Sequence, residues 1–397
     1  MPKPIHKLIE RKTDNAKALL RYPYIRWKLK ADYRLFFFFP FWQIGGGERV
    51  HADILKVFRS ERSLCFITDQ SENDGFKKEF QSYADTLTLG RWAKKPSFKK
   101  LMLKHIADAI NRQQEAVAFG CHSHFFYELI PFLAKHVKVV DLIHAFTFDP
   151  NGPEHYSLPH VPRLDQRVIL GEKTKRDFRQ LYQEKGLDLQ YLERFTIIPN
   201  QSHIPADPPA KDYLGRLTVL FVSRNAPEKR PEVFIEIARR CAAQQLPTEF
   251  IMVGDFKHWE KEQIPQLNFA GEIFDRDALT ALYRSAHIIL VTSWREGFPL
   301  VMMEGMGNGV VPIATAVGEI PAYISSEGKR NGFLIENEQN IHAVIDNFVE
   351  CVALLCEQRH QLKEFSLQAY QYAKDNFGPE RFGEFYRRLL LGVNITK

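Results

Sequence analysis

The alternation of short apolar runs with amphipathic stretches constrains the fold of this 397-residue chain more than any other sequence feature. Strands are predicted at residues 33–39, 63–68, 116–120, 137–143 and 167–170, and again at 217–222, 249–253, 266–270, 287–291, 310–314 and 332–334. Helical spacing is found at residues 1–30, 50–59, 98–111, 125–135, 174–185, 231–242, 278–285, 341–374 and 379–391. Such alternation is typical of parallel sheets covered by helices.

A break rich in proline and polar residues, Pro199–Lys211, divides the strands into two series and reads as a linker. We therefore predict an α/β chain of two Rossmann-like, doubly wound domains that face each other across a cleft. The predicted segments are a basic helical leader (1–34), an N-terminal domain (35–200), a linker (201–210), a C-terminal domain (211–377) and a last helix (378–397) that returns to the N-terminal domain. Ligands of such sheets bind beyond the carboxyl ends of the strands.

The cysteines argue against a disulfide framework or a structural zinc site, because they number five and form no C-x-x-C pair. The first residues lack the apolar segment of a signal peptide, and runs such as LFFFFPFW are too short to span a bilayer. A cytoplasmic protein is expected, with possible peripheral contact at the inner face of the membrane.

The positive charge is concentrated in residues 1–34, which hold ten Lys/Arg against three Asp/Glu. A solvated basic helix explains this pattern, and so does contact with an anionic membrane surface or an anionic acceptor. No nucleic-acid partner is expected, because no reader motif accompanies the charge.

The strongest motif is S-W-R-E-G-F-P-L-V-M-M-E-G-M-G-N-G at residues 293–309. Glu296 follows a predicted strand, Gly297 permits a tight turn, and Pro299 suits the first turn of a helix near Leu300–Met306. The free N–H groups of that helix, those of Leu300 and Val301, would form an anion site. Glu304 lies among methionines, where a carboxylate needs hydrogen-bond partners such as ribose hydroxyls. The alternative is a loop glutamate and an exposed helix glutamate.

A second motif, residues 223–231, places Arg224, Lys229 and Arg230 ahead of the helix that begins at Pro231. Cations are unfavourable at a helix N-terminus unless an anion is bound there. A diphosphate would resolve the conflict, gripped by the planar fork of Arg224 and by Lys229. A solvated basic loop is the alternative.

Two weaker signals lie in the first half of the chain. Gly45–Gly47 follows a predicted strand and lets backbone approach a ligand, although it does not form G-x-G-x-x-G. His144 ends the strand at 137–143 and suits polarising a hydroxyl. A tight turn and a structural histidine are the respective alternatives.

Two apparent metal motifs are interpreted otherwise. Asp275 and Asp277 spell D-x-D, but Asp275 reads better as a helix N-cap. In Cys121-His122-Ser123-His124, strand alternation would place the histidines together and the cysteine opposite, so lining of an acceptor pocket is favoured over metal binding.

Together these residues resemble retaining glycosyltransferase family 4 (glycosyl transferases group 1), most strongly from about Pro199 to Phe333. Glu296 and Glu304 match the E-x7-E element of that family, and Arg224 with Lys229 matches its basic pair. Gly45–Gly47 is similar to its glycine loop, and His144 to its cleft histidine. The V-G-E-I-P element at Val317–Pro321 is also similar. The chain has Lys229-Arg230 where the family often has Lys-Gly.

The resemblance implies a GT-B fold and a role for each matched residue. Glu296 would hold hydroxyls of the donor sugar, and Glu304 the ribose. The backbone at Gly297, Phe298, Pro299, Leu300 and Val301 would line the sugar and diphosphate site, with Gly46 and Gly47 also binding the donor. Arg224 and Lys229 would neutralise the leaving diphosphate, His144 would approach the donor sugar, and Gly254 and Ile273 would lie near the base.

The function that follows is transfer of a hexosyl unit, with retention, from a UDP- or GDP-sugar to a glycan or lipid-linked acceptor in cell-surface polysaccharide biosynthesis. No cofactor and no metal are expected, because cations and helix N–H groups can stabilise the diphosphate. Two alternatives stay open: a nucleotide-sugar epimerase or phosphorylase-like enzyme of the same fold, and a non-catalytic nucleotide-sugar-binding partner subunit.

Overall fold

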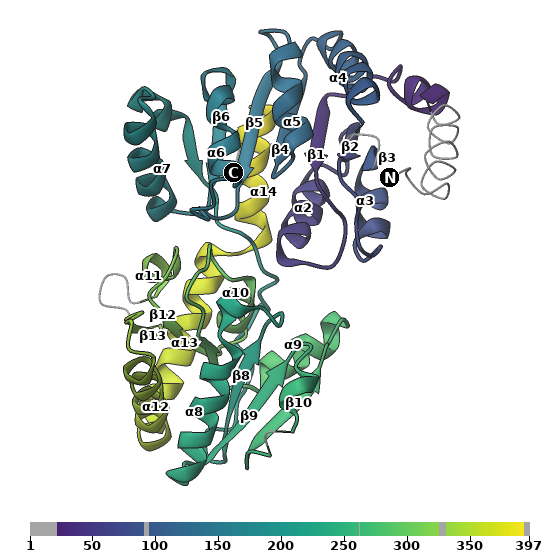
Figure 1. Ribbon diagram of the computed structural model, residues 1–397. Coiled ribbons are helices and arrows are strands. Elements are labelled where there is room, and N and C mark those ends of the chain that lie inside the picture. Colours follow the sequence, from purple (N-terminus) through teal and green to yellow (C-terminus); the bar gives the residue numbers. More distant parts are fainter. Residues whose placement is uncertain (1–21, 91–94, 262, 325–330, 393–397) are drawn as a thin grey trace, which may run out of the picture. The chain divides into compact units, whose positions relative to one another are not determined.

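The computed structural model describes residues 22–90, 95–261, 263–324 and 331–392 (Figure 1). The chain divides into two compact units. The first comprises the residues up to Ile169, Phe178–Thr196 and the chain from Tyr386 onward, and the second comprises Leu170–Asp177 and Ile197–Phe385. The predicted leader falls largely on residues 1–21, which lie outside the described residues; residues 22–28 are helical.

The first unit is built on a seven-stranded parallel sheet in the order β3-β2-β1-β4-β5-β6-β7. Its strands are β1 (Leu35–Phe39), β2 (Ser63–Ile67), β3 (Asp85–Thr88), β4 (Val117–Cys121), β5 (Lys138–Ile143), β6 (Gln166–Ile169) and β7 (Phe195–Ile197). The connecting helices are α2 (Gly46–Val57), α3 (Lys77–Tyr83), α4 (Pro96–Asn111), α5 (His124–Leu129), α6 (Pro153–Tyr156) and α7 (Glu172–Lys185), and α14 (Pro379–Leu391) follows much later in the chain. Short 3₁₀ turns occupy Ile130–Phe132, Leu158–Arg163 and Leu189–Arg194.

Strand β1 shows why this sheet is buried on both faces. Its five residues, LFFFF, are all buried, and alternate side chains leave opposite faces of the sheet. Phe36 and Phe38 join the cluster that contains α4 and α5. Phe37 packs on Phe58 at the end of α2, and Phe119 of β4 meets Tyr386 of α14 on that face.

The second unit carries a six-stranded parallel sheet in the order β10-β9-β8-β11-β12-β13. Its strands are β8 (Leu217–Val222), β9 (Thr248–Val253), β10 (Leu267–Gly271), β11 (Ile288–Val291), β12 (Val311–Thr315) and β13 (Phe333–Ile335). Its helices are α8 (Pro231–Ala243), α9 (Arg276–Ser285), α10 (Leu300–Gly307), α11 (Ile320–Tyr323), α12 (Ile341–Glu357) and α13 (Arg359–Asn376), with 3₁₀ turns at Pro227–Lys229 and Lys257–Trp259.

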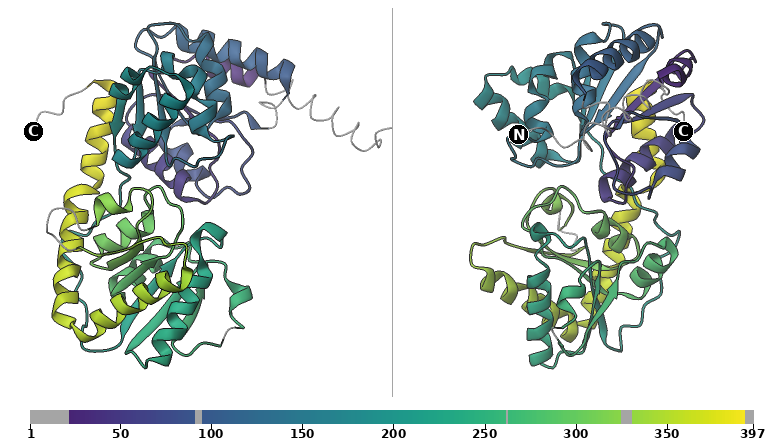
Figure 2. Two further views of the ribbon diagram at one scale, coloured as in Figure 1. Left: turned by 60° about the vertical axis from the view of Figure 1, so that its left-hand side comes forward. Right: turned by 45° about the vertical axis from the view of Figure 1, so that its right-hand side comes forward.

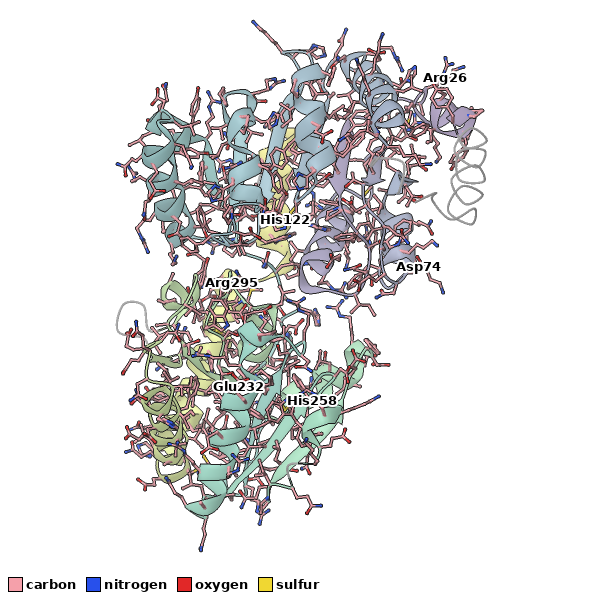
Figure 3. The ribbon with its side chains drawn as sticks, viewed as in Figure 1. Arg26, Asp74, His122, Glu232, His258 and Arg295 are labelled. Atoms are coloured by element: carbon pink, nitrogen blue, oxygen red, sulfur yellow. The ribbon has the colours of Figure 1, made fainter. Side chains whose placement is uncertain are left out.

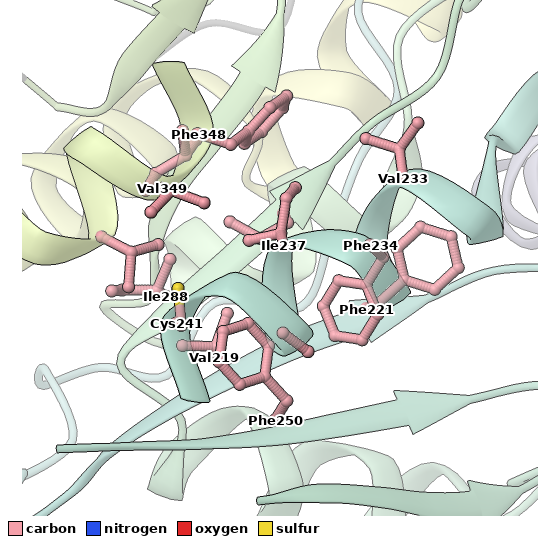
Figure 4. Packing of buried hydrophobic residues seen from close by; sticks show 14 of the residues in the cluster. Val219, Phe221, Val233, Phe234, Ile237, Cys241, Phe250, Ile288, Phe348 and Val349 are labelled. Carbon is pink, nitrogen blue, oxygen red and sulfur yellow. The ribbon is translucent and has the colours of Figure 1, made fainter. Parts of the chain in front are cut away.

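Helices cover both faces of this second sheet (Figure 2). On one face, α8 and α12 pack on β8, β9 and β11 through the apolar cluster drawn in Figure 4, which includes Phe221, Phe234, Ile237, Phe250 and Phe348. On the other face, residues of α9 and α10 close the core against the same strands. The predicted pair of Rossmann-like sheets is therefore observed in two separate units.

Three differences from the predicted elements have simple causes. β3 and β7 lie at the sheet edges, and their residues are mostly part-exposed, so neither carries the apolar run by which strands are recognised. The helical stretch predicted at 341–374 is formed by two helices, separated at Gln358. Within the described ranges, no helix is both long and apolar enough to cross a membrane.

Candidate donor site

Glu296 lies in the turn after β11, and the chain itself holds its carboxylate in place. Lys229 Nζ donates to Glu296 Oε1 at 2.6 Å, and Ser293 Oγ donates to the same oxygen at 2.7 Å. The Glu296 side chain is 9% exposed and that of Lys229 is 20% exposed. Because β8 and β11 are neighbouring strands, the residues that follow them meet at one edge of the sheet.

The turn that begins at Gly297 leads directly into α10. Pro299 is the residue before the helix rather than its first residue, which corrects its predicted place in the first turn. Phe298 is buried against Tyr323 and Phe377, so its side chain is structural and only its backbone can meet a ligand. The N–H groups of Leu300 and Val301 belong to the first turn of α10, where no intrahelical acceptor exists. A helix end with free N–H groups can receive an anion, and the anion site at Leu300 and Val301 stays a prediction.

Gly318 braces the same turn from the loop after β12. Its backbone has φ +57, and a Cβ built there would lie 2.1 Å from Glu296 O and 2.6 Å from Gly297 O. Glu319 N also donates to Gly297 O at 2.8 Å. Only glycine fits, since both the backbone conformation and the space exclude a larger residue.

The three cations ahead of α8 prove to have different surroundings. Arg224 is exposed and pairs with Glu228 at 3.1 Å, whereas Lys229 reaches Glu296. Arg230 is buried, and its guanidinium donates to the backbone carbonyls of Thr292 and Ser293. The unfavourable placement of three cations before the N-terminus of α8 is thus partly offset by partners within the chain. Arg224 and Lys229 are the two of these cations that are able to contact a diphosphate.

Arg230 also explains the departure from the Lys-Gly pattern. Its backbone is left-handed, with φ 50 and ψ 57, a conformation that glycine adopts at little cost. The two hydrogen bonds of its side chain to the end of β11 hold an arginine in that conformation. The loop therefore keeps the shape that a glycine would give it.

Glu304 has a partner that the sequence did not reveal. Tyr283, at the end of α9, donates its hydroxyl to Glu304 Oε2 at 3.0 Å. Burial and the neighbouring carboxylate raise the pKa of Tyr283, which keeps its hydroxyl protonated and able to donate. The apolar stretch around Glu304 is thus compatible with a carboxylate even before a ligand adds hydrogen bonds.

Gly254 and Ile273 follow β9 and β10, the strands next to β8. Gly254 has φ +140, and a Cβ there would lie 2.1 Å from Ser223 O, so this glycine allows the loops after β8 and β9 to touch. Gly254 N donates to Gly271 O at 2.9 Å, which joins this loop to the last residue of β10. His258, labelled with Arg295 in Figure 3, lies in the 3₁₀ turn that follows Gly254.

In the first unit, the predicted glycine loop and His144 are brought together. Gly46 and Gly47 open α2, and a Cβ at Gly47 would lie 3.6 Å from His144 Nε2. His144 Nε2 also lies 3.1 Å from Nε2 of His51, a buried residue of α2 that sequence reasoning missed. In the sequence, His51 lies on the apolar face of a predicted helix, and nothing there distinguishes a functional histidine from one that only fills the core.

The comparisons with known proteins bear mainly on the second unit. Residues 207–369 match the family model described as "Glycosyl transferases group 1". The trehalose synthase of Thermococcus litoralis is 28% identical over 217 residues, which are 51% of this chain and 47% of that protein. The D-inositol 3-phosphate glycosyltransferase of Mycolicibacterium gilvum is 30% identical over 119 residues, 27% of this chain and 26% of that protein. The resemblance to the group 1 glycosyltransferases is confirmed.

The architecture agrees with that result. HepE of Anabaena, solved in complex with UDP, has a TM-score of 0.69 at 16% identity and covers 91% of this chain and 100% of that one. The predicted GT-B fold is therefore confirmed. The chain spans about half the length of the trehalose synthase that it matches.

The two apparent metal motifs of this chain are resolved differently. Asp275 is the predicted N-cap: its carboxylate accepts from the N–H groups of Asp277 and Ala278. In the second motif β4 ends at Cys121, and His122 has φ 49, so strand alternation does not continue through it. Cys121 instead joins His51 and His144, with potential ligand atoms within 4.8 Å of one another.

Proposed function

We propose that the protein is a metal-independent glycosyltransferase of the retaining type, which moves a hexosyl unit from a nucleotide-sugar to a glycan or lipid-linked acceptor. The observation that carries the proposal is the arrangement around Glu296: a carboxylate fixed by Lys229 and Ser293, placed directly before the N-terminus of α10. A fixed hydroxyl-binding carboxylate beside an anion-binding helix end and two cations matches the parts of a sugar diphosphate.

The proposed reaction follows from where charge develops. The bond between the anomeric carbon and the diphosphate oxygen breaks, and negative charge grows on the diphosphate. Lys229, Arg224 and the first amides of α10 stabilise that charge without reorganisation. The acceptor oxygen bonds to the anomeric carbon on the same face, and its proton passes to the leaving diphosphate. His144 is proposed to meet the donor sugar, as the resemblance implies.

UDP is the preferred donor base in this proposal, with GDP as the alternative. The support is that HepE, whose fold this chain shares, was solved with UDP. The loops that contain Gly254 and Ile273 would take the base, and Glu304 the ribose.

The acceptor is proposed to belong to cell-surface polysaccharide synthesis, with the enzyme at the inner face of the membrane. Supporting this, residues 22–30 expose aromatic and basic side chains: Trp27 is 65% exposed and Tyr24 49% exposed, beside the exposed Arg26 and Lys30. Aromatic and basic side chains together favour an anionic bilayer surface. Sedimentation with phosphatidylglycerol vesicles should fall for Trp27→Ser and with added salt. Equal binding to neutral vesicles would contradict the contact.

The donor site is tested by calorimetry with UDP-, GDP-, ADP- and TDP-sugars in EDTA, on the wild type and on Glu296→Gln. We expect one nucleotide series to bind the wild type, and the sugar-dependent part of the affinity to be lost in the variant. NMR of the product with a simple glycan acceptor then reads the anomeric configuration. Failure of every nucleotide to bind would contradict the proposal, and an inverted product would contradict retention.

Two outcomes would point to the alternative functions. Conversion of the donor without an acceptor would indicate an epimerase. Donor binding without transfer, restored by a second protein, would indicate a partner subunit.

A further inference from the structure

Two histidines of the first unit form a direct hydrogen bond. His51 lies in the second turn of α2, and His144 is the residue that directly follows β5. Their Nε2 atoms lie 3.1 Å apart. His51 is the hydrogen-bond partner of His144 in the part of the chain that the structure describes. The Nδ1 atom of His144 is therefore left for a ligand.

The ring of His51 is fixed by packing. It is 2% exposed and stacks on Phe39 of β1, with ring centroids 4.1 Å apart and planes inclined by 9°. Rotation of the imidazole would break this stack as well as the bond to His144. The geometry of the pair is thus set by the core of the unit rather than by a ligand.

Both rings are neutral near pH 7. Burial lowers the pKa of His144 to about 3 and that of His51 well below its usual range. The neighbouring His122 lowers both pKa values further, and His144 also lowers that of His51. A neutral imidazole carries one N–H, so one of the two facing Nε2 atoms holds the proton and the other accepts it.

The Nδ1 atom of His51 indicates which of the two facing Nε2 atoms carries the hydrogen. Its Nδ1 is buried and has no hydrogen-bond partner among the described residues. If His144 donated, His51 would carry its hydrogen on that Nδ1, as a buried N–H without an acceptor, which is the rarer and costlier defect in proteins. If His51 donates from Nε2, Nδ1 is only an unused acceptor. The second arrangement is favoured.

We propose that His51 is a positioning residue whose Nε2–H holds His144 in the Nδ1–H tautomer, so that His144 presents a neutral hydrogen-bond donor to a hydroxyl oxygen of the ligand. That this ligand is a donor sugar rests on the proposed function, whereas the tautomer does not. An orienting group that fixes the tautomer of a reactive histidine has large effects on rate in other enzymes.

The neighbouring Cys121 offers a different interpretation, which the experiment must separate. Its sulfur and the two nitrogens could together hold a metal ion. Burial raises the pKa of the Cys121 thiol, which disfavours the thiolate that a metal needs. A hydrogen-bonded pair of neutral rings is the better account of these atoms.

The tautomer is read by long-range ¹H–¹⁵N NMR on full-length protein labelled with ¹⁵N-histidine, with His144 assigned from the spectrum of His144→Gln. We expect a pyrrole-type Nδ1 and a pyridine-type Nε2 in His144, without any substrate. An Nε2–H form of His144 would overturn the proposal. So would a thiolate-to-metal absorption band on addition of Co²⁺, lost in His51→Gln, since the nitrogens would then be ligands. Neither outcome depends on transferase activity.

Two substitutions at position 51 separate positioning from packing. His51→Phe keeps a ring on Phe39 but removes the donor, whereas His51→Gln places an amide N–H near Nε2. We expect the Phe variant to lose the fixed tautomer and to lower kcat about 10–100-fold with unchanged nucleotide affinity, by analogy with outer-shell partners of other sites. The Gln variant should recover most of the fixed tautomer and most of the wild-type kcat. Equal loss in the two variants, following their melting temperatures, would mean a structural role only.

Discussion

At the scale of single residues, the pair Tyr283–Glu304 gives the sharpest prediction about the ribose. A hydrogen bond to a charged group contributes about 1.5–3 kcal/mol, so Glu304→Gln should weaken UDP binding about tenfold or more. Tyr283→Phe removes only the orienting bond to Glu304 and should weaken binding by a smaller factor. Calorimetry measures both, with the exposed Glu350→Gln as control. Unchanged affinity in Glu304→Gln would remove Glu304 from the site.

Arg230 permits a clean measurement of backbone strain. Arg230→Gly and Arg230→Ala both lose the bonds to the carbonyls of Thr292 and Ser293, so both should be less stable than the wild type. They differ in the cost of the left-handed conformation, which is about 1 kcal/mol for alanine relative to glycine. Urea denaturation should show the glycine variant as the more stable by about that amount. An equal loss would mean that the loop changes conformation when the arginine is removed.

At the scale of elements, the loop after β12 supports the turn before α10. Gly318→Ala places a methyl group against the carbonyls of Glu296 and Gly297, so we expect loss of donor binding as well as lower stability. Gly186→Ala is the matched control, since Gly186 also has a positive φ, +67, but open space around its Cβ position. Gly186→Ala should lose about 1 kcal/mol of stability, and Gly318→Ala should lose more because its methyl group also meets the two carbonyls. Donor affinity, measured by calorimetry, should fall only in Gly318→Ala.

Three buried histidines, which lie after β4, after β5 and in α2, predict how the stability of the chain depends on pH. Burial lowers the pKa of His122 to about 4 and that of His144 to about 3, and lowers that of His51 as well. Histidines in the unfolded chain titrate near 6.5, so between that pH and about 4 the unfolded chain binds more protons than the folded one. The free energy of unfolding should therefore fall as pH falls through this range, by up to about 1.4 kcal/mol per pH unit for each histidine.

Urea denaturation between pH 7.5 and 4.5 measures this slope. His144→Gln should flatten it, and the exposed His203→Gln should leave it unchanged. A slope that is the same in the wild type and in His144→Gln would show that His144 is not held neutral by burial.

At the scale of the whole molecule, the two units should respond differently to nucleotide. In the proposed function, the base, the ribose and the diphosphate are assigned to residues of the second unit, at the carboxyl ends of β8, β9, β10 and β11 or in α10. Hydrogen exchange with UDP in EDTA should protect the amides of Leu300 and Val301 and leave those of α4 unchanged. A need for a divalent cation would contradict the metal-independent site.

Much of the fold was predictable because a buried parallel strand must be a continuous apolar run. All six strands of the second unit fall within one or two residues of their predicted positions. The edge strands β3 and β7 were not predictable, since an edge strand needs few apolar residues. The helical stretch predicted at 341–374 is confirmed, but its division at Gln358 was not predictable because no glycine or proline marks the break.

The residues that follow each strand can be identified from the amino-acid sequence alone, and in a parallel sheet this brings Arg224, Glu296 and Gly254 to one edge. The spacing of Glu296 and Glu304 also suggested the resemblance to the group 1 glycosyltransferases. The partners of these residues became visible in the folded chain: Tyr283 for Glu304, Arg230 for the end of β11, Gly318 for the turn at Glu296, and His51 for His144. These partners come from separate elements, and side-chain contacts between distant elements depend on packing that no local pattern records.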